Sequence, residues 1–243
     1  MRKLYNAFAC FTVCALLLPA AALGAGLGAG PGGPVIGIMA DHLEHQWGET
    51  NSRTYHWDGT ISAGYDRDKL IVNFEGAYDP DAHETAESGV EVFYARAIDT
   101  YIDLQLGIRA ALDHGPNEQF AVAGFAGDLP YGFEFEVLGA LSTDGTVLLE
   151  GELETDLLIT QKLSLNPTIT LDLSGHDDDQ LGLARGVTGI GYDIRLLYAV
   201  TPEFAPYLGV AGDHALGGTR SKTRTGGGDP DETKATAGIR LSF

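Results

Sequence analysis

The stretch Ala237-Gly238-Ile239-Arg240-Leu241-Ser242-Phe243 alternates apolar residues with small or polar ones at the end of the chain. Successive side chains of a β-strand point to opposite faces, so the apolar residues share one face and Arg240 lies on the other. A soluble core does not suit a strand that ends on an exposed aromatic residue. A membrane barrel does, because its apolar face meets lipid and its polar face meets a lumen. The stretch therefore predicts a strand that closes a membrane barrel.

The same alternation recurs along the chain and predicts about twelve strands. In residues 163–174, for example, Leu165, Ile169 and Leu171 alternate with Thr168, Thr170 and Asp172. Strands of a soluble β-sandwich alternate as well, so alternation alone does not separate the two fold classes. The predicted strands are residues 36–47, 55–66, 69–79, 89–98, 101–113, 119–127, 132–142, 146–157, 163–174, 188–199, 206–215 and 233–243.

The connections between these strands separate the two classes. Long polar connections near residues 48–54, 80–88, 114–118, 175–187 and 216–232 alternate with tight turns, and only residues 143–145 break the rule by being short. Long loops at one end and tight turns at the other are typical of outer-membrane barrels, whose termini lie in the periplasm. We therefore predict an all-β, antiparallel up-and-down transmembrane barrel over residues 36–243.

The segment before the barrel has the features of an export signal. Residues 1–24 begin with Arg2 and Lys3, continue with an apolar run and end among small residues, as a secretory signal peptide does. Both cysteines lie within it, so the mature chain would carry no thiol. Residues 25–35 are rich in Gly and Pro and predict an extended periplasmic tether.

Aromatic and acidic residues fit the barrel. The residues expected near strand ends, where an interfacial girdle would lie, are Tyr55, Trp57, Tyr65, Tyr78, Tyr94, Tyr101, Tyr131, Tyr198, Phe204 and Tyr207. The net charge of −19 makes nucleic acid a poor partner. Many acids fall on the polar faces and predict an acidic lumen that attracts cations. The lumen acids are Glu75, Glu91, Asp103, Glu134, Glu136, Glu150, Glu152, Glu154 and Asp156.

Several ordered motifs together resemble the copper resistance protein B family (CopB/PcoB). The resemblance extends from about residue 36 to residue 243. The motifs are Ile36 to Trp47 with its Asp41-His42-Leu43-Glu44 core, Tyr55-His56-Trp57-Asp58, Tyr65-Asp66-Arg67-Asp68-Lys69-Leu70, Phe74-Glu75-Gly76, Tyr94-Ala95-Arg96-Ala97-Ile98, Asp103 to Arg109, Leu157 to Leu165 and Glu203 to Val210.

The resemblance implies an outer-membrane β-barrel of a Gram-negative bacterium that takes part in copper homeostasis and resistance. It also implies a periplasmic copper-binding or copper-oxidising partner. Members of this family often carry a long extension rich in Met and His before the barrel. Here residues 24–34 contain neither residue type. Copper binding would therefore depend on the barrel itself.

The first hairpin is the densest candidate for copper ligands. It contains Met39, His42, Glu44, His45, His56 and Asp58. Imidazole suits Cu(II) and thioether suits Cu(I). If Glu44 pairs with Asp58, then His42, Glu44, His56 and Asp58 form one inward cluster, while Met39 and His45 face the other way. The alternative is that these residues are ordinary polar groups of the lumen.

Other functions are less well supported by the sequence. The chain has no G-x-S-x-G motif, and its paired acids recur at every second position, as lumen patterning requires. We therefore predict neither catalysis nor an organic cofactor. The main alternative to a copper role is a general cation-selective outer-membrane pore. A third possibility is a structural barrel with a plugged lumen.

Overall fold

The computed structural model describes residues 33–48, 52–112, 119–179 and 181–243. The signal peptide, most of the tether and His114 lie outside the described residues. The strands are β1 (Val35–Gly48), β2 (Arg53–Gly64), β3 (Asp68–Asp79), β4 (Glu84–Ala97), β5 (Ile102–Ala111), β6 (Gln119–Leu129), β7 (Phe133–Ser142), β8 (Val147–Thr155), β9 (Leu157–Leu158), β10 (Leu163–Ser174), β11 (Gly186–Tyr198), β12 (Phe204–Ala215) and β13 (Asp231–Ser242).

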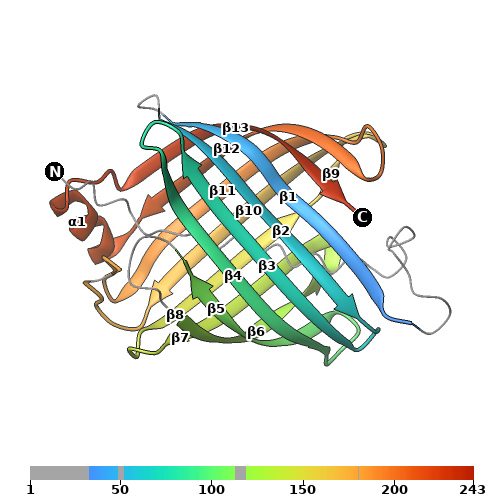
Figure 1. The fold of residues 1–243 in the computed structure, drawn as a ribbon, viewed down its shortest axis with the longest axis horizontal. Helices are drawn as coiled ribbons and strands as arrows, with labels where there is room; N and C mark the ends of the chain where they lie inside the picture. The colour runs from blue at the N-terminus through green and yellow to red at the C-terminus, as the bar shows by residue number, and fades with distance from the viewer. Residues whose placement is uncertain (1–32, 49–51, 113–118, 180) are drawn as a thin grey trace.

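These strands form one closed antiparallel barrel (Figure 1). Each strand pairs with the next in sequence, except that β8 pairs with β10, and the first strand, β1, pairs with the last, β13. The short β9 continues β8 beyond Asp156, and both pair with β10. Counted as one, β8 and β9 give the barrel twelve strands, as predicted. Backbone hydrogen bonds between Ile38 and Phe243, at 2.8 and 2.9 Å, complete the closure at the chain end.

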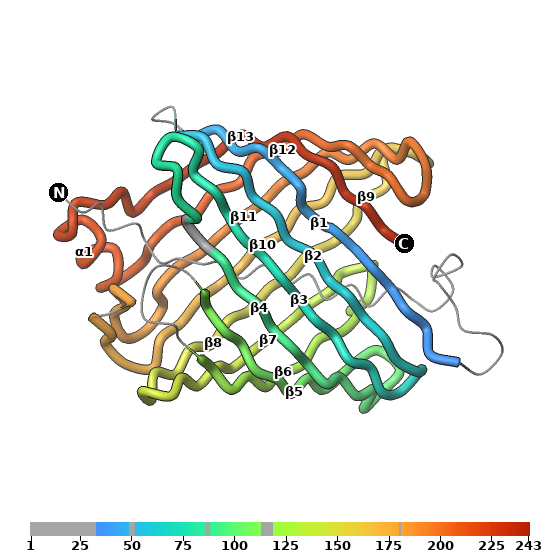
Figure 2. Tube along the Cα trace, viewed as in Figure 1, coloured from blue at the N-terminus to red at the C-terminus, as the bar shows by residue number. Residues whose placement is uncertain are grey.

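The two ends of the barrel differ, as the loop lengths predict. We call the end where β1 starts and β13 finishes the turn end, and the opposite end the loop end. The strand connections alternate between these two ends (Figure 2). The loop end carries a helix that the sequence analysis missed, α1 (Gly217–Thr225). Lys222 of this helix reaches Asp179 at 2.7 Å, and Thr219 accepts a hydrogen bond from the Ala184 amide. The helix thus joins the β12–β13 connection, which contains it, to the β10–β11 connection.

One 3-10 turn, η1 (Pro130–Gly132), joins β6 to β7 at the turn end. Among the described residues, no helix combines the length and the apolar character that crossing a membrane requires.

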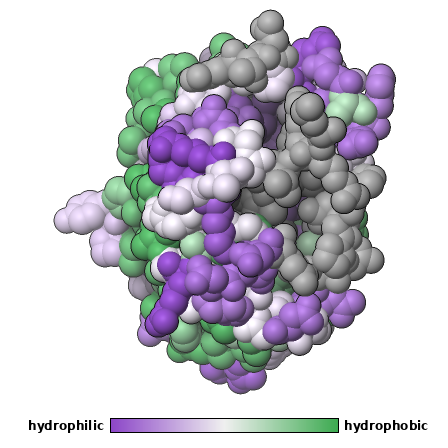
Figure 3. Space-filling view, turned by 90° about the vertical axis from the view of Figure 1, so that its left-hand side faces the viewer, coloured by the Kyte–Doolittle hydropathy of each residue, from purple (hydrophilic) through white to green (hydrophobic). Residues whose placement is uncertain are grey.

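Apolar side chains cover the outside of the wall. Leu208 is 67% exposed, Ile108 is 66% exposed and Leu106 is 49% exposed, although all three lie in the middle of strands. Figure 3 looks onto the loop end, where hydrophilic residues are prominent and hydrophobic residues lie along the flank. An exposed apolar belt around a barrel fits contact with lipid.

The inside is polar over much of its surface, with one exception. Ile71, Phe93, Phe120, Val122 and Leu138 form a buried apolar cluster on the inner wall between β3 and β7. Strand alternation in the sequence does not predict this cluster. On β6, inward Phe120 and Val122 alternate with outward alanines, so both faces of the strand are apolar and periodicity cannot assign them.

The lipid-facing role of the outer surface can be tested with Leu208→Arg. A charged arginine near the middle of a lipid-facing strand should lower the free energy of unfolding by about 2–4 kcal/mol. Urea unfolding in lipid vesicles measures this change. Asp144→Arg, in the exposed β7–β8 turn, is the control and should change stability by less than about 0.5 kcal/mol. Equal stability of the two variants would contradict the assignment.

Candidate metal centre

A β-bulge in β1 shapes the centre of the lumen. Met39 pairs with Thr60 on β2, but the next paired position joins His42 to Asp58, so β1 contains one extra residue. The same shift occurs against β13, between Ala40 and Leu43. A bulge changes which side of the sheet the following residues face. Asp41 and His42 are therefore both buried, at 1% and 3% exposure, although they are consecutive.

The predicted pairing of Glu44 with Asp58 is wrong. His42 pairs with Asp58 and Glu44 pairs with His56, because the hairpin closes with Trp47 opposite Arg53. The prediction that Met39 faces away from His42 is also wrong. Met39 is buried, and the bulge puts it on the same side of the strand as His42. A strand without a bulge would have placed the two on opposite faces.

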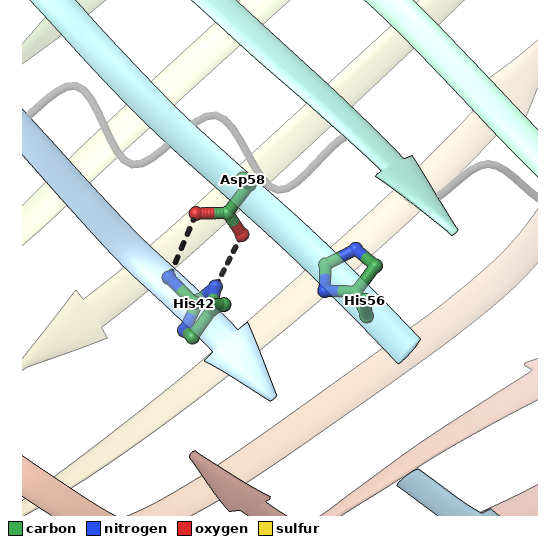
Figure 4. Close-up of side chains that lie close together, drawn as sticks. All are labelled: His42, His56 and Asp58. Atoms are coloured by element: carbon green, nitrogen blue, oxygen red, sulfur yellow. Dashed lines mark hydrogen bonds and ion pairs between the residues drawn. The ribbon is translucent and has the colours of Figure 1, made fainter. Parts of the chain in front are cut away.

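Three side chains of the first hairpin converge inside the barrel: His42, His56 and Asp58 (Figure 4). Each offers one possible ligand atom, and these atoms all lie within 4.8 Å of one another. The His42 amide donates to Asp58 Oδ1 at 3.1 Å, and the His42 ring nitrogen Nδ1 contacts Asp58 Oδ2. The His42 and His56 rings are 6.3 Å apart.

The hydrogen bonds leave metal-binding nitrogens free. His42 Nε2 and His56 Nδ1 are buried, and within the described part of the chain they have no hydrogen-bond partner. A carboxylate that accepts from one imidazole nitrogen fixes the tautomer in which the other nitrogen carries the lone pair. Asp58 therefore orients His42 with Nε2 available as a ligand. Two imidazoles, one of them oriented by a carboxylate, form a donor set for Cu(II) or Zn(II).

Glu44 lies beside these residues but is already bound. Its carboxylate accepts hydrogen bonds from Tyr207 at 2.8 Å, from Gln46 at 2.7 Å and from Arg195 at 3.3 Å. His56 Nδ1 is 3.9 Å from Glu44 Oε1. The side chain of Glu44 is fully buried. Glu44 therefore links β1 to β11 and β12, and its carboxylate is not free to act as a metal ligand.

Glycine residues allow Arg195 and Tyr207 to reach Glu44. A Cβ atom at Gly238 would lie 2.6 Å from the Tyr207 hydroxyl and from Glu44 Cβ. A Cβ at Gly209 would lie 2.9 Å from Arg195 Cγ. Because these two positions carry no side chain, groups from β11 and β12 can cross the inner wall to β1.

The remaining predicted hairpin residue lies elsewhere. His45 is on the opposite face of β1, where its ring stacks on Tyr55 at 4.7 Å and contacts Trp47 at 4.3 Å. His45 is thus separated by the wall from His42 and His56. This outer aromatic group lies where the predicted girdle would be. Tyr207, also predicted for the girdle, instead points into the lumen at 4% exposure, and that prediction is wrong.

The predicted lumen acids follow the inward positions of their strands, except Asp156. Asp156 is exposed between β8 and β9, where it accepts a hydrogen bond from Asn166 at 3.0 Å. Some inward acids have basic partners: Arg195 is 2.5 Å from Asp193, and Lys69 is 3.2 Å from Asp103. Acids outnumber bases inside the described barrel, which favours cations in the lumen.

Sequence reasoning missed part of the centre. Strand alternation does not reveal that Arg195 and Arg240 reach β1. In the structure Arg240 Nε lies 3.5 Å from Asp41 Oδ1. The inward glycines were the available signal, because alternation makes Gly238, which pairs with Glu44, and Gly209, which pairs with Arg195, gaps in the inner wall.

Comparison with known proteins relates this barrel to a copper resistance family. The family described as "Copper resistance protein B precursor (CopB)" matches residues 35–243. "Copper resistance protein B" of Escherichia coli is 30% identical over 206 residues, which cover 85% of this chain and 69% of that protein. "Copper resistance protein B homolog" of Pseudomonas syringae pv. tomato is 30% identical over 207 residues, with the same coverage.

Solved structures share the fold at low sequence identity. The NanC porin has a TM-score of 0.55 and 13% identity, covering 85% of this chain and 99% of that one. The KdgM porin has a TM-score of 0.50 and 12% identity, with the same coverage. At such identities the likeness concerns only the barrel architecture.

The anchoring role of Arg195 can be tested by Arg195→Met. Removing the guanidinium leaves Glu44 buried and uncompensated, so the variant should lose about 3–5 kcal/mol of stability in urea unfolding. The double variant Arg195→Met with Glu44→Gln should recover part of that loss, because the unpaired charge of Glu44 is gone while that of Asp193, the other partner of Arg195, remains. An additive effect of the two changes would show that the pair does not interact.

Proposed function

Because the chain belongs to the copper resistance protein B family, we propose that it is an outer-membrane barrel that binds copper ions in its lumen and passes them across the membrane. The observation that carries this proposal is the convergence of His42, His56 and Asp58 on the inner wall. Nitrogen and oxygen donors favour Cu(II) over Cu(I), which prefers thioether and thiolate ligands.

The surroundings of the three residues support a cationic substrate. Near them lie four carboxylates, of Asp41, Glu44, Asp58 and Asp193, and two guanidinium groups, of Arg195 and Arg240. This excess of negative charge attracts a divalent ion. Because Asp58 is tied to His42 and Glu44 to Arg195, few charged ligands are free, which favours weak binding and release. A conducting site has to release its ion.

The direction of the barrel follows from its ends. Tight turns, the start of β1 and the end of β13 share one side, which in bacterial outer-membrane barrels is the periplasmic side. We place the turn end of this barrel in the periplasm and the loop end, with α1, outside the cell. A periplasmic copper-binding or copper-oxidising protein would then exchange copper at the turn end. This role requires no catalytic group.

Copper binding is tested with purified protein in detergent. His42→Ala with His56→Ala removes both imidazole ligands and should weaken Cu(II) binding by about tenfold or more, since each lost ligand of this kind costs affinity. The matched control is His45→Ala, which removes a histidine from the other face of the same strand and should bind like the unchanged protein. Equal Cu(II) affinity of all three proteins would refute the site.

Proton competition gives an independent check on the same site. Imidazole binds metal only in its neutral form, so Cu(II) affinity should fall as the pH decreases below about 6. Titrations at several pH values measure this decline. A flat profile, or one that the double alanine variant shares, would mean that carboxylates alone hold the ion.

Passage is tested in lipid vesicles that contain a copper-sensitive dye. The unchanged protein should admit Cu(II), and the double alanine variant should admit it more slowly while planar-bilayer K⁺ conductance stays the same. Equal Cu(II) entry in both proteins would favour a general cation-selective pore. Absence of Cu(II) entry through the unchanged protein would refute passage and leave binding as the role.

A further inference from the structure

Two pairs of acids face each other on neighbouring strands across the barrel from the histidines. Glu136 on β7 pairs with Glu152 on β8, and Glu134 pairs with Glu154. Side chains at paired positions have Cβ atoms about 4.5–5.5 Å apart, and like charges there destabilise a sheet. A buried arrangement of this kind requires a neutralising partner.

The arginine in this region is already engaged. Arg109 contacts Glu91 through Nε, and its two terminal nitrogens donate to Glu150 at 2.6 Å each. Its guanidinium is almost fully buried, at 1% exposure. A two-pronged contact of this type is strong and directional. The positive charge of Arg109 is therefore shared by Glu91 and Glu150, and the Glu136–Glu152 pair is left with excess negative charge.

Two oxygens of the Glu136–Glu152 pair and one of Gln105 lack hydrogen bonds. Within the described residues, Glu136 Oε1, Glu152 Oε2 and Gln105 Oε1 are buried and have no partner. Gln105 is 1% exposed and Glu136 is 7% exposed. Buried polar atoms in folded proteins nearly always have a partner, so such atoms call for an ion or a bound group.

The local packing places Gln105 beside Glu136 and Glu136 beside Glu152. The Gln105 side chain lies within hydrogen-bonding reach of Glu136, although β6 separates their strands. At the crossing point β6 has Gly124, opposite Gln105, where a Cβ would lie 2.8 Å from Leu138 Cδ2. Glu136 and Glu152 also line a small pocket, together with Glu150, Thr170 and Asp172.

We propose that Glu136 and Glu152, with Gln105 holding the Glu136 carboxylate in place, form a second cation site, which takes a hard divalent ion such as Ca²⁺. The charged donors are carboxylate oxygens, and side chains at paired strand positions that line one pocket can share an ion at about 2.3–2.6 Å. Such a site prefers Ca²⁺ or Mg²⁺ to copper, which favours nitrogen and sulfur ligands. It is separate from the histidine site, but Glu152 lies within electrostatic range of Asp58 and Asp41. An ion here would offset the acidic charge that faces the histidines.

The test uses Ca²⁺ as the probe and the purified full-length barrel in detergent. Glu136→Gln with Glu152→Gln keeps the side-chain shapes and removes both charges. Equilibrium dialysis should show at least about tenfold weaker Ca²⁺ binding for this variant, because two charged ligands are lost. Ca²⁺ should raise the unfolding temperature of the unchanged protein and have little effect on that of the variant.

Two further variants separate this proposal from the copper role. Glu84→Gln with Asp144→Asn removes two exposed charges at the loop end and should bind Ca²⁺ normally. His42→Ala with His56→Ala should lose Cu(II) and keep Ca²⁺, so failure at one site does not imply failure at the other. Equal Ca²⁺ binding by the unchanged protein and the glutamine variant would overturn the proposal and indicate that the carboxylates share protons instead.

Discussion

The pairing of β1 with β13 is the constraint on which the structure depends. Through it the first and last strands of the described barrel pair with each other instead of forming free edges, and only a closed wall satisfies every backbone group in a lipid environment. Closure also divides the side chains of each strand between the outside and the inside. Apolar residues such as Leu208 then meet lipid, whereas charged residues such as Arg195 and Glu44 are confined to a narrow interior.

Confinement decides the chemistry of the interior. A charge removed from water needs a partner of opposite sign, and this barrel supplies such partners across strands. Arg195 reaches Glu44, Arg109 joins Glu91 to Glu150, and Arg240 lies near Asp41. The acids that exceed these pairs are concentrated around the first hairpin and along β7 and β8. The same constraint that stabilises the wall therefore prepares the lumen for cations.

The two candidate sites differ in donor chemistry. The first hairpin offers two imidazoles beside a carboxylate, which suits a copper role in a copper resistance family. The facing acids Glu136 and Glu152 offer only oxygen. Their placement on opposite walls would let one barrel hold two kinds of ion. The bulge in β1 matters here, because it adds Asp41 next to His42 and increases the negative charge at the histidines.

Much of the fold was accessible from the sequence, because the alternation from Leu163 to Ser174 and the loop lengths depend only on strand geometry and on lipid. The inward position of Glu136 and Glu152 followed from the same rule. Other features required the tertiary structure. The bulge that turns Met39 inward, the pairing of Glu44 with His56 and the inward turn of Tyr207 leave no trace in a regular two-residue pattern. They depend on how distant strands fit across glycines such as Gly238, since only closure of the barrel brings β11 and β12 beside β1.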